Sequence, residues 1–200
     1  MNNSLRFVGK HRALLSMLVT ILLAPMAGCA GEIERRWSED VVLPDGSVVA
    51  IDRYVKFKES NAPGGDAYSS TDLRSTLALK GEQSAIATWE GPLVPLVLYR
   101  NQAAGEWVIV ATTSNCDTWF ERGSPVPPYW EFRLKSGKWE PSKLSELSLG
   151  LKTNLFFDYE PASPPKQISQ ATKLQIIQKN EFAKKYLSID AAVKAKCMQR

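Results

Sequence analysis

The sequence predicts an α+β fold that is mostly β: an antiparallel sheet or β-sandwich with a C-terminal helix packed on it. Most of the chain consists of short apolar or alternating stretches separated by turn residues, which is typical of strands. Residues 169–187 then contain many helix formers and no Gly or Pro. Because a run of strands followed by one helix is the pattern of an α+β domain, we expect one domain of this class.

The first hairpin is predicted at residues 41–51, where apolar stretches flank the turn sequence Pro44-Asp45-Gly46. Asp-Gly supplies the positive φ that a tight hairpin turn needs. The second strand is expected to continue to Phe57. Residues 29–38 are charged, and we interpret them as a tether that precedes a single domain over residues 39–200.

Apolar residues alternate again over residues 73–80, and a partner strand is predicted at 85–89. Residues 93–99 and 106–111 are apolar on both faces, which favours central strands that are buried on two sides. Pro95 donates no ladder hydrogen bond, so it must lie at an edge or a bulge.

Two more strands are predicted at residues 130–134 and 138–140, joined by a Lys-Ser-Gly turn. Trp130, Phe132 and Leu134 then share one face. A last strand is predicted at residues 153–159.

A helical segment is predicted over residues 168–197, with one helix at 169–187 and a shorter one that Ser188 caps and that extends to residue 195. Its lysines alternate with uncharged residues, which is typical of a solvated helix face. They are Lys173, Lys179, Lys184, Lys185, Lys194 and Lys196.

The N-terminus has the layout of a secretory signal, with three basic residues before an apolar run at 13–24 and no acidic residue before Glu32. As a helix this run rises about 18 Å, less than the roughly 30 Å hydrocarbon core of a bilayer. Cleavage is therefore favoured over a permanent span.

The sequence Met26-Ala27-Gly28-Cys29 resembles the lipobox of bacterial lipoproteins, with Met26 where Leu is usual. The resemblance covers residues 1–29 only. It implies that residues 1–28 are removed and that acylated Cys29 anchors the protein in the lipid bilayer. Ala30, where Asp would favour the inner membrane, implies the outer membrane with the domain facing the periplasm. An uncleaved anchor and an ordinary buried cysteine are the alternatives.

Signal removal takes away three of the 25 basic residues and none of the 21 acidic ones, so the formal net charge falls from +4 to +1. This balance does not predict a nucleic-acid partner, which needs a clustered basic face. His11, the only histidine, also leaves. The mature sequence therefore excludes Ser-His and Cys-His catalysis and His-containing zinc sites, and we expect no metal and no cofactor.

Cys116 and Cys197 remain once Cys29 is linked to lipid. An even pair of cysteines in an oxidising periplasm is expected to form a disulfide. The bond would link the C-terminal tail covalently to the segment after the 106–111 strand. Two separate thiols are the alternative.

No other motif in the sequence predicts a catalytic site. Ser163 and Lys166 have the S-x-x-K spacing, but the two prolines between them prevent the helical turn that this dyad needs. Carboxylate pairs such as Asp117 with Glu121, or Glu131 with Glu140, match the chemistry of glycoside cleavage, but such pairs arise freely among 21 acidic residues and solvated surface charge is the favoured explanation. The sequence therefore predicts no catalytic residue.

Residues 115–132 are the candidate binding loop, because aromatic residues flank a proline-rich centre there. Such a loop can present a platform for a sugar or a peptide, or its aromatics can pack beneath it as a small core. The aromatic residues are Trp119, Phe120, Tyr129 and Trp130.

These observations favour a non-enzymatic envelope lipoprotein that binds or scaffolds an envelope protein or a cell-wall component. The alternatives are a carboxylate-dependent cell-wall glycosidase or lyase, and an inhibitor of wall-degrading enzymes.

Overall fold

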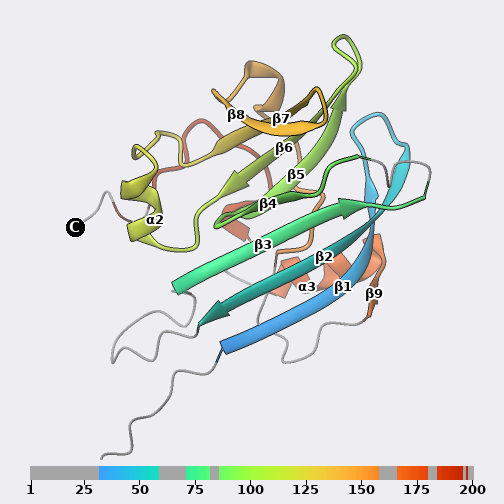
Figure 1. The fold of residues 1–200 in the computed structure, drawn as a ribbon, viewed down its shortest axis with the longest axis horizontal. Helices are drawn as coiled ribbons and strands as arrows, with labels where there is room; N and C mark the ends of the chain where they lie inside the picture. Colours follow the sequence, from blue (N-terminus) through green and yellow to red (C-terminus); the bar gives the residue numbers. More distant parts are fainter. Residues whose placement is uncertain are drawn as a thin grey trace, which may run out of the picture. The chain divides into compact units, whose positions relative to one another are not determined.

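The computed structural model describes residues 32–58, 71–81, 86–157, 166–179, 184–195 and 197, all within one compact unit, Gly31–Arg200. The predicted signal sequence and Cys29 lie outside the described residues, as do residues 59–70. The elements are β1 (Glu32–Val42), β2 (Val48–Lys58), β3 (Thr71–Leu79), β4 (Trp89–Gly91), β5 (Val94–Asn101), β6 (Glu106–Thr112), α2 (Cys116–Glu121), β7 (Trp130–Lys135), β8 (Lys138–Ser142), η2 (Glu146–Ser148), β9 (Gln167–Ile168) and α3 (Gln170–Lys179) (Figure 1). The fold is α+β and mostly β, as predicted.

One sheet has the strand order β4-β3-β2-β1-β9. Its β1–β2 hairpin turns at residues 43–47, and Gly46 has a φ of 84°, so the predicted role of Asp-Gly is confirmed. Strand β2 continues through Phe57, as predicted, and ends at Lys58.

The tether predicted at 29–38 is wrong from Glu32 onward, because β1 begins at that residue. The charged residues made this segment resemble a solvated tether, but they lie mainly on one side of the strand. Glu34 and Arg36 face solvent, whereas Trp37 is buried in the core. A two-residue period therefore places a tryptophan inside a segment that looks hydrophilic overall.

The other sheet has the order β5-β6-β7-β8. Strands β5 and β6 are buried on both faces, which confirms the prediction from their apolar sequences. Pro95 lies in an edge strand and next to a shift in register, where the missing ladder hydrogen bond is tolerated. The β7–β8 turn uses positive φ at Ser136 and Gly137.

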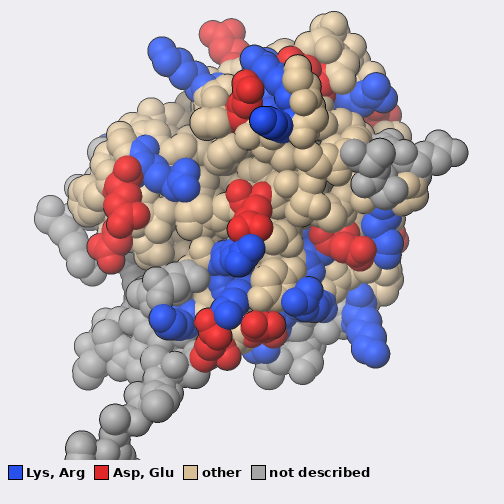
Figure 2. Space-filling view, in the orientation of Figure 1, with Lys and Arg blue, Asp and Glu red and all other residues tan. Residues whose placement is uncertain are grey.

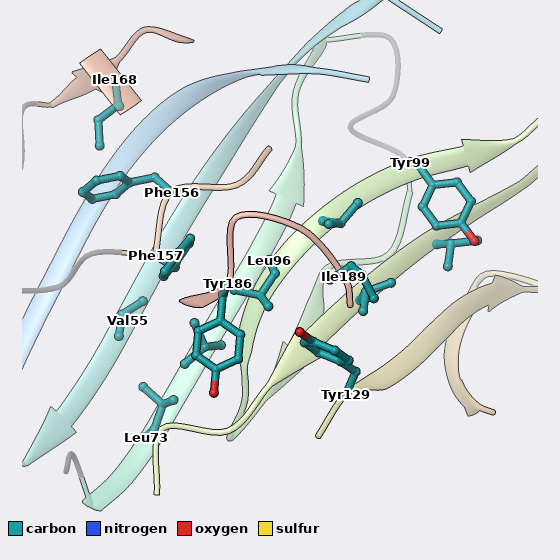
Figure 3. Packing of buried hydrophobic residues seen from close by; sticks show 14 of the residues in the cluster. Val55, Leu73, Leu96, Tyr99, Tyr129, Phe156, Phe157, Ile168, Tyr186 and Ile189 are labelled. Atoms are coloured by element: carbon teal, nitrogen blue, oxygen red, sulfur yellow. The ribbon is translucent and has the colours of Figure 1, made fainter. Parts of the chain in front are cut away.

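Two apolar clusters fill the two faces of the second sheet. One face, with Ile109 and Phe132, packs against Trp89 and its neighbours from the first sheet. The opposite face, with Val108 and Val110, packs against Val55, Leu73 and the C-terminal segments. Figure 3 shows Phe156, Tyr186 and Ile189, from the C-terminal segments, packed in the cluster on this opposite face.

The C-terminal segment is less helical than predicted. The structure describes helix over α3 (Gln170–Lys179) and at residues 184–185, and residues 180–183 lie outside the described residues. The predicted helix from Ser188 to residue 195 is absent, because Ser188 pairs with Lys152 in a β-bridge. Ile189 is fully buried and exchanges backbone hydrogen bonds with 150–151, so tertiary packing overrides helix propensity here.

The strand predicted at 153–159 does not form over residues 153–157, and 158–159 lie outside the described residues. The backbone N–H groups of Asn154 and Leu155 both donate to the Leu96 carbonyl, which breaks the ladder pattern. The Asn154 side chain bonds the N–H and C=O of Leu98 and also the C=O of Val42. It therefore joins the edge of β5 to the end of β1.

No helix in the described part of the chain has both the length and the apolar character needed to cross a bilayer.

Candidate functional site

The candidate binding loop is fixed at its start by a disulfide. Cys116 and Cys197 are bonded, with their Cα atoms 5.4 Å apart, which confirms the predicted pair. Cys116 is the first residue of α2, whose N-terminus is capped by the Asn115 side chain accepting from the N–H of Thr118 at 2.8 Å. The C-terminal tail is thereby attached to the segment that follows β6.

Three of the four predicted aromatic residues hold this loop in place. Trp119 is 5% exposed, packs with Cys116, Cys197 and Trp130, and donates its indole N–H to the Pro125 carbonyl at 3.1 Å. Tyr129 lies in the main core beside Tyr186, and burial raises its pKa to about 12. Half-buried Trp130 points its indole N–H at the Arg122 carbonyl, 3.4 Å away. Trp119 and Trp130 form a small core beneath the loop with the disulfide, and Tyr129 joins the loop to the main core, so the aromatics pack beneath the loop in one of the two expected arrangements.

Phe120 is the aromatic residue that the loop presents to solvent, with 59% of its surface exposed. Its ring contacts the buried Trp119 ring at a centroid distance of 4.9 Å. Val126 is equally exposed and directly follows Pro125, the acceptor of the Trp119 indole bond. Sequence reasoning missed Val126, since a single valine among prolines carries no signal of exposure.

The loop returns to its own helix through a tight turn. Gly123 and Ser124 both have positive φ, and the N–H of Ser124 donates to the Trp119 carbonyl at 2.9 Å. We define the apolar tip as Phe120 and Val126. It is small, exposed and supported by a disulfide, a buried tryptophan and a backbone turn.

The carboxylate pair Glu131 and Glu140 does not form a catalytic arrangement. Glu131 is fully buried, and its oxygens accept hydrogen bonds from Ser145, Ser148 and Arg133 at 2.7–2.9 Å. Burial alone would raise its pKa, but these hydrogen bonds outweigh burial and lower it. A saturated, inaccessible carboxylate cannot serve as a general acid, so Glu131 instead positions the turn around η2.

The other predicted pair, Asp117 and Glu121, lies on the exposed side of α2. Neither side chain is buried, so the arrangement agrees with solvated surface charge.

A buried charged triad, Glu39, Arg53 and Lys173, was not foreseen. Glu39 Oε1 pairs with Arg53 Nη1 at 3.2 Å and Glu39 Oε2 with Lys173 Nζ at 2.7 Å. Lys173 is 1% exposed, which corrects its predicted place on a solvated helix face. Its ammonium also donates to the carbonyls of Asp40 and Asn154. Burial lowers the pKa of Lys173, and Glu39 opposes that shift.

The open face of the first sheet holds a polar group made of Ser38, Asp52 and Lys80. Ser38 Oγ donates to Asp52 Oδ1 at 2.5 Å, and Lys80 Nζ lies 3.2 Å from the same oxygen. Lys80 Nζ also lies 3.4 Å from Ser38 Oγ, so the three side chains form one polar network on the surface of the sheet. Figure 2 shows basic and acidic side chains interspersed over this face.

Among the described residues, no group of three or more His, Cys, Asp or Glu side chains is arranged to hold a metal ion. The apolar tip comprises the large apolar side chains that the predicted binding loop exposes among the described residues. Comparison with protein families, curated proteins and solved structures finds no match to this chain.

Proposed function

We propose that the protein is a lipoprotein of the bacterial cell envelope, anchored by acylated Cys29, whose β-rich domain binds or scaffolds a partner in the periplasm. The lipobox-like sequence at residues 26–29 supports the anchor. The Cys116–Cys197 disulfide supports an oxidising compartment, since such bonds are rare where thiols are kept reduced. The outer membrane remains the proposed location, on the basis of Ala30.

The observation that carries the binding role is the apolar tip on its rigid support. Exposed aromatic and aliphatic side chains on a preorganised segment bind with little loss of conformational entropy. Protein–protein interfaces concentrate their binding energy in such anchors, which enter pockets of the partner. The tip is therefore suited to a partner with a matching apolar pocket.

A protein partner in the envelope is favoured over a cell-wall sugar. A sugar platform uses the faces of Trp or Tyr together with polar groups, whereas Trp119 and Tyr129 are buried here. Phe120 and Val126 offer apolar contact alone.

The test is in-cell photo-crosslinking of the mature lipoprotein with a photoreactive residue at position 122, beside the tip. We expect a specific protein adduct that Phe120→Ala abolishes. Leu147→Ala is the matched control, because Leu147 is 62% exposed but lies outside the loop. Adducts that persist in Phe120→Ala would refute the role of the tip. Release of muropeptides from purified cell walls by the mature protein would refute the non-enzymatic assignment.

A further inference from the structure

We infer that the end of the first sheet where β1 begins rests on the anionic phospholipid headgroups of the membrane that carries the anchor. This inference depends on the proposed acylation of Cys29. Three Cα–Cα steps separate Cys29 from Glu32, the first residue of β1. At 3.8 Å a step, the strand begins at most about 11 Å along the chain from the acylated residue.

The short connection determines which residues meet the bilayer. Strands β1 and β2 are antiparallel, with Glu32 opposite Lys58 and Glu34 opposite Lys56. The start of β1 therefore lies beside the end of β2, and Figure 1 shows the start of β3 at the same end of the sheet. We call residues 32–36 and 56–58 the membrane end.

The membrane end has an excess of positive charge. It contains the basic residues Arg35, Arg36, Lys56 and Lys58 and the acidic residues Glu32 and Glu34, a formal charge of +2. Lys56 pairs with both carboxylates, at 2.8 Å from Glu32 and 3.6 Å from Glu34. In formal charge Lys56 and Lys58 balance the two carboxylates, so the excess comes from Arg35 and Arg36, of which Arg36 is the exposed one.

Arg36 is the side chain best prepared to bind a phosphate. It is exposed, and its guanidinium lies over the ring of Tyr54 at 4.1 Å from the centroid. Within the described residues no carboxylate pairs with it. A guanidinium stacked on an aromatic ring keeps its N–H donors free at the edge, in the geometry that binds phosphate oxygens in pairs.

The contact is with headgroups and not with the hydrocarbon core. The large apolar side chains that the described surface exposes lie outside the membrane end, and the one in β2, Val48, is at the opposite end of that strand. A polar, positively charged surface this close to an anchor fits an anionic bilayer interface, where basic residues are attracted within about a Debye length.

The experiment uses acylated mature protein in vesicles of phosphatidylcholine, with or without phosphatidylglycerol. A benzophenone amino acid replaces Glu34 or, as the matched control, Glu140, which is also an exposed strand glutamate. Lipid adducts are measured by mass spectrometry after illumination. We expect adducts at position 34, strongest with phosphatidylglycerol, and few at position 140. Arg36→Gln should lower the yield at position 34 by up to about fivefold in the anionic vesicles, whereas Lys138→Gln should not.

Equal yields at positions 34 and 140, or an Arg36→Gln protein that behaves like Lys138→Gln, would overturn the inference. The mass of the mature protein is measured first. A mature protein without acyl chains on Cys29 would refute the proposed anchor, whereas acylated protein with equal adduct yields would refute only the orientation.

Discussion

Replacing Glu39 should destabilise the domain more than replacing Lys173, although the two side chains form one ion pair. Glu39 accepts from Arg53, Lys173 and the backbone N–H of Phe156, at 3.2, 2.7 and 2.9 Å. Glu39→Gln leaves two buried cations facing each other without a counter-ion, whereas Lys173→Met leaves Glu39 paired with Arg53. Breaking a buried pair costs about 3–5 kcal/mol, so we expect Glu39→Gln in the upper half of that range and Lys173→Met at about 2–3 kcal/mol.

The two substitutions should also couple. In the double variant only one buried cation remains, so its loss of stability should be smaller than the sum of the single losses by about 1–3 kcal/mol. The assay is urea unfolding of the mature protein carrying Cys29→Ser, followed by tryptophan fluorescence. A Lys173→Met loss equal to or greater than that of Glu39→Gln would refute this reasoning, as would strict additivity.

Three further predictions concern the loop and the buried carboxylate. Replacing both Cys116 and Cys197 by Ser should lower the free energy of unfolding by about 4 kcal/mol, because the bond closes an 81-residue separation, and an unchanged urea midpoint would contradict this. Trp119→Ala should cost about 3–5 kcal/mol in the same assay, whereas Phe120→Ala should change stability by less than about 0.5 kcal/mol, since only the tryptophan is buried. The folded-state pKa of Glu131 lies below its usual 4.5, so its contribution to stability is present above that pH and is lost as the pH falls through the folded value. Glu131→Gln should therefore flatten the loss of stability between about pH 5 and pH 3, and an identical acid transition in both proteins would argue against this role.

The hairpins could be predicted from sequence because their signals are local. Alternation, the Asp-Gly turn at residues 45–46 and the largely apolar sequences of β5 and β6 each lie within about ten residues of chain. The disulfide could also be predicted, since counting cysteines needs no geometry once Cys29 is assigned to lipid.

The charged triad could not be predicted in the same way. Glu39 and Lys173 are far apart in sequence, and each looks like an ordinary surface charge in its own segment. One signal was available, because Glu39 follows Trp37 by two residues and so must share the inward face of β1. The same limit applies to the candidate loop, where composition identified the aromatics but only packing separated exposed Phe120 from buried Trp119.

The Asn154 side chain has a consequence for how this protein behaves beside its own copies. A sheet edge with free backbone groups invites strand addition by another chain. Strand β5 is an edge of its sheet, yet its Leu96 carbonyl and both backbone groups of Leu98 are already bonded to residues 154–155. One amide side chain and a non-strand segment thus block that edge, which protects the protein from edge-to-edge aggregation with its own copies.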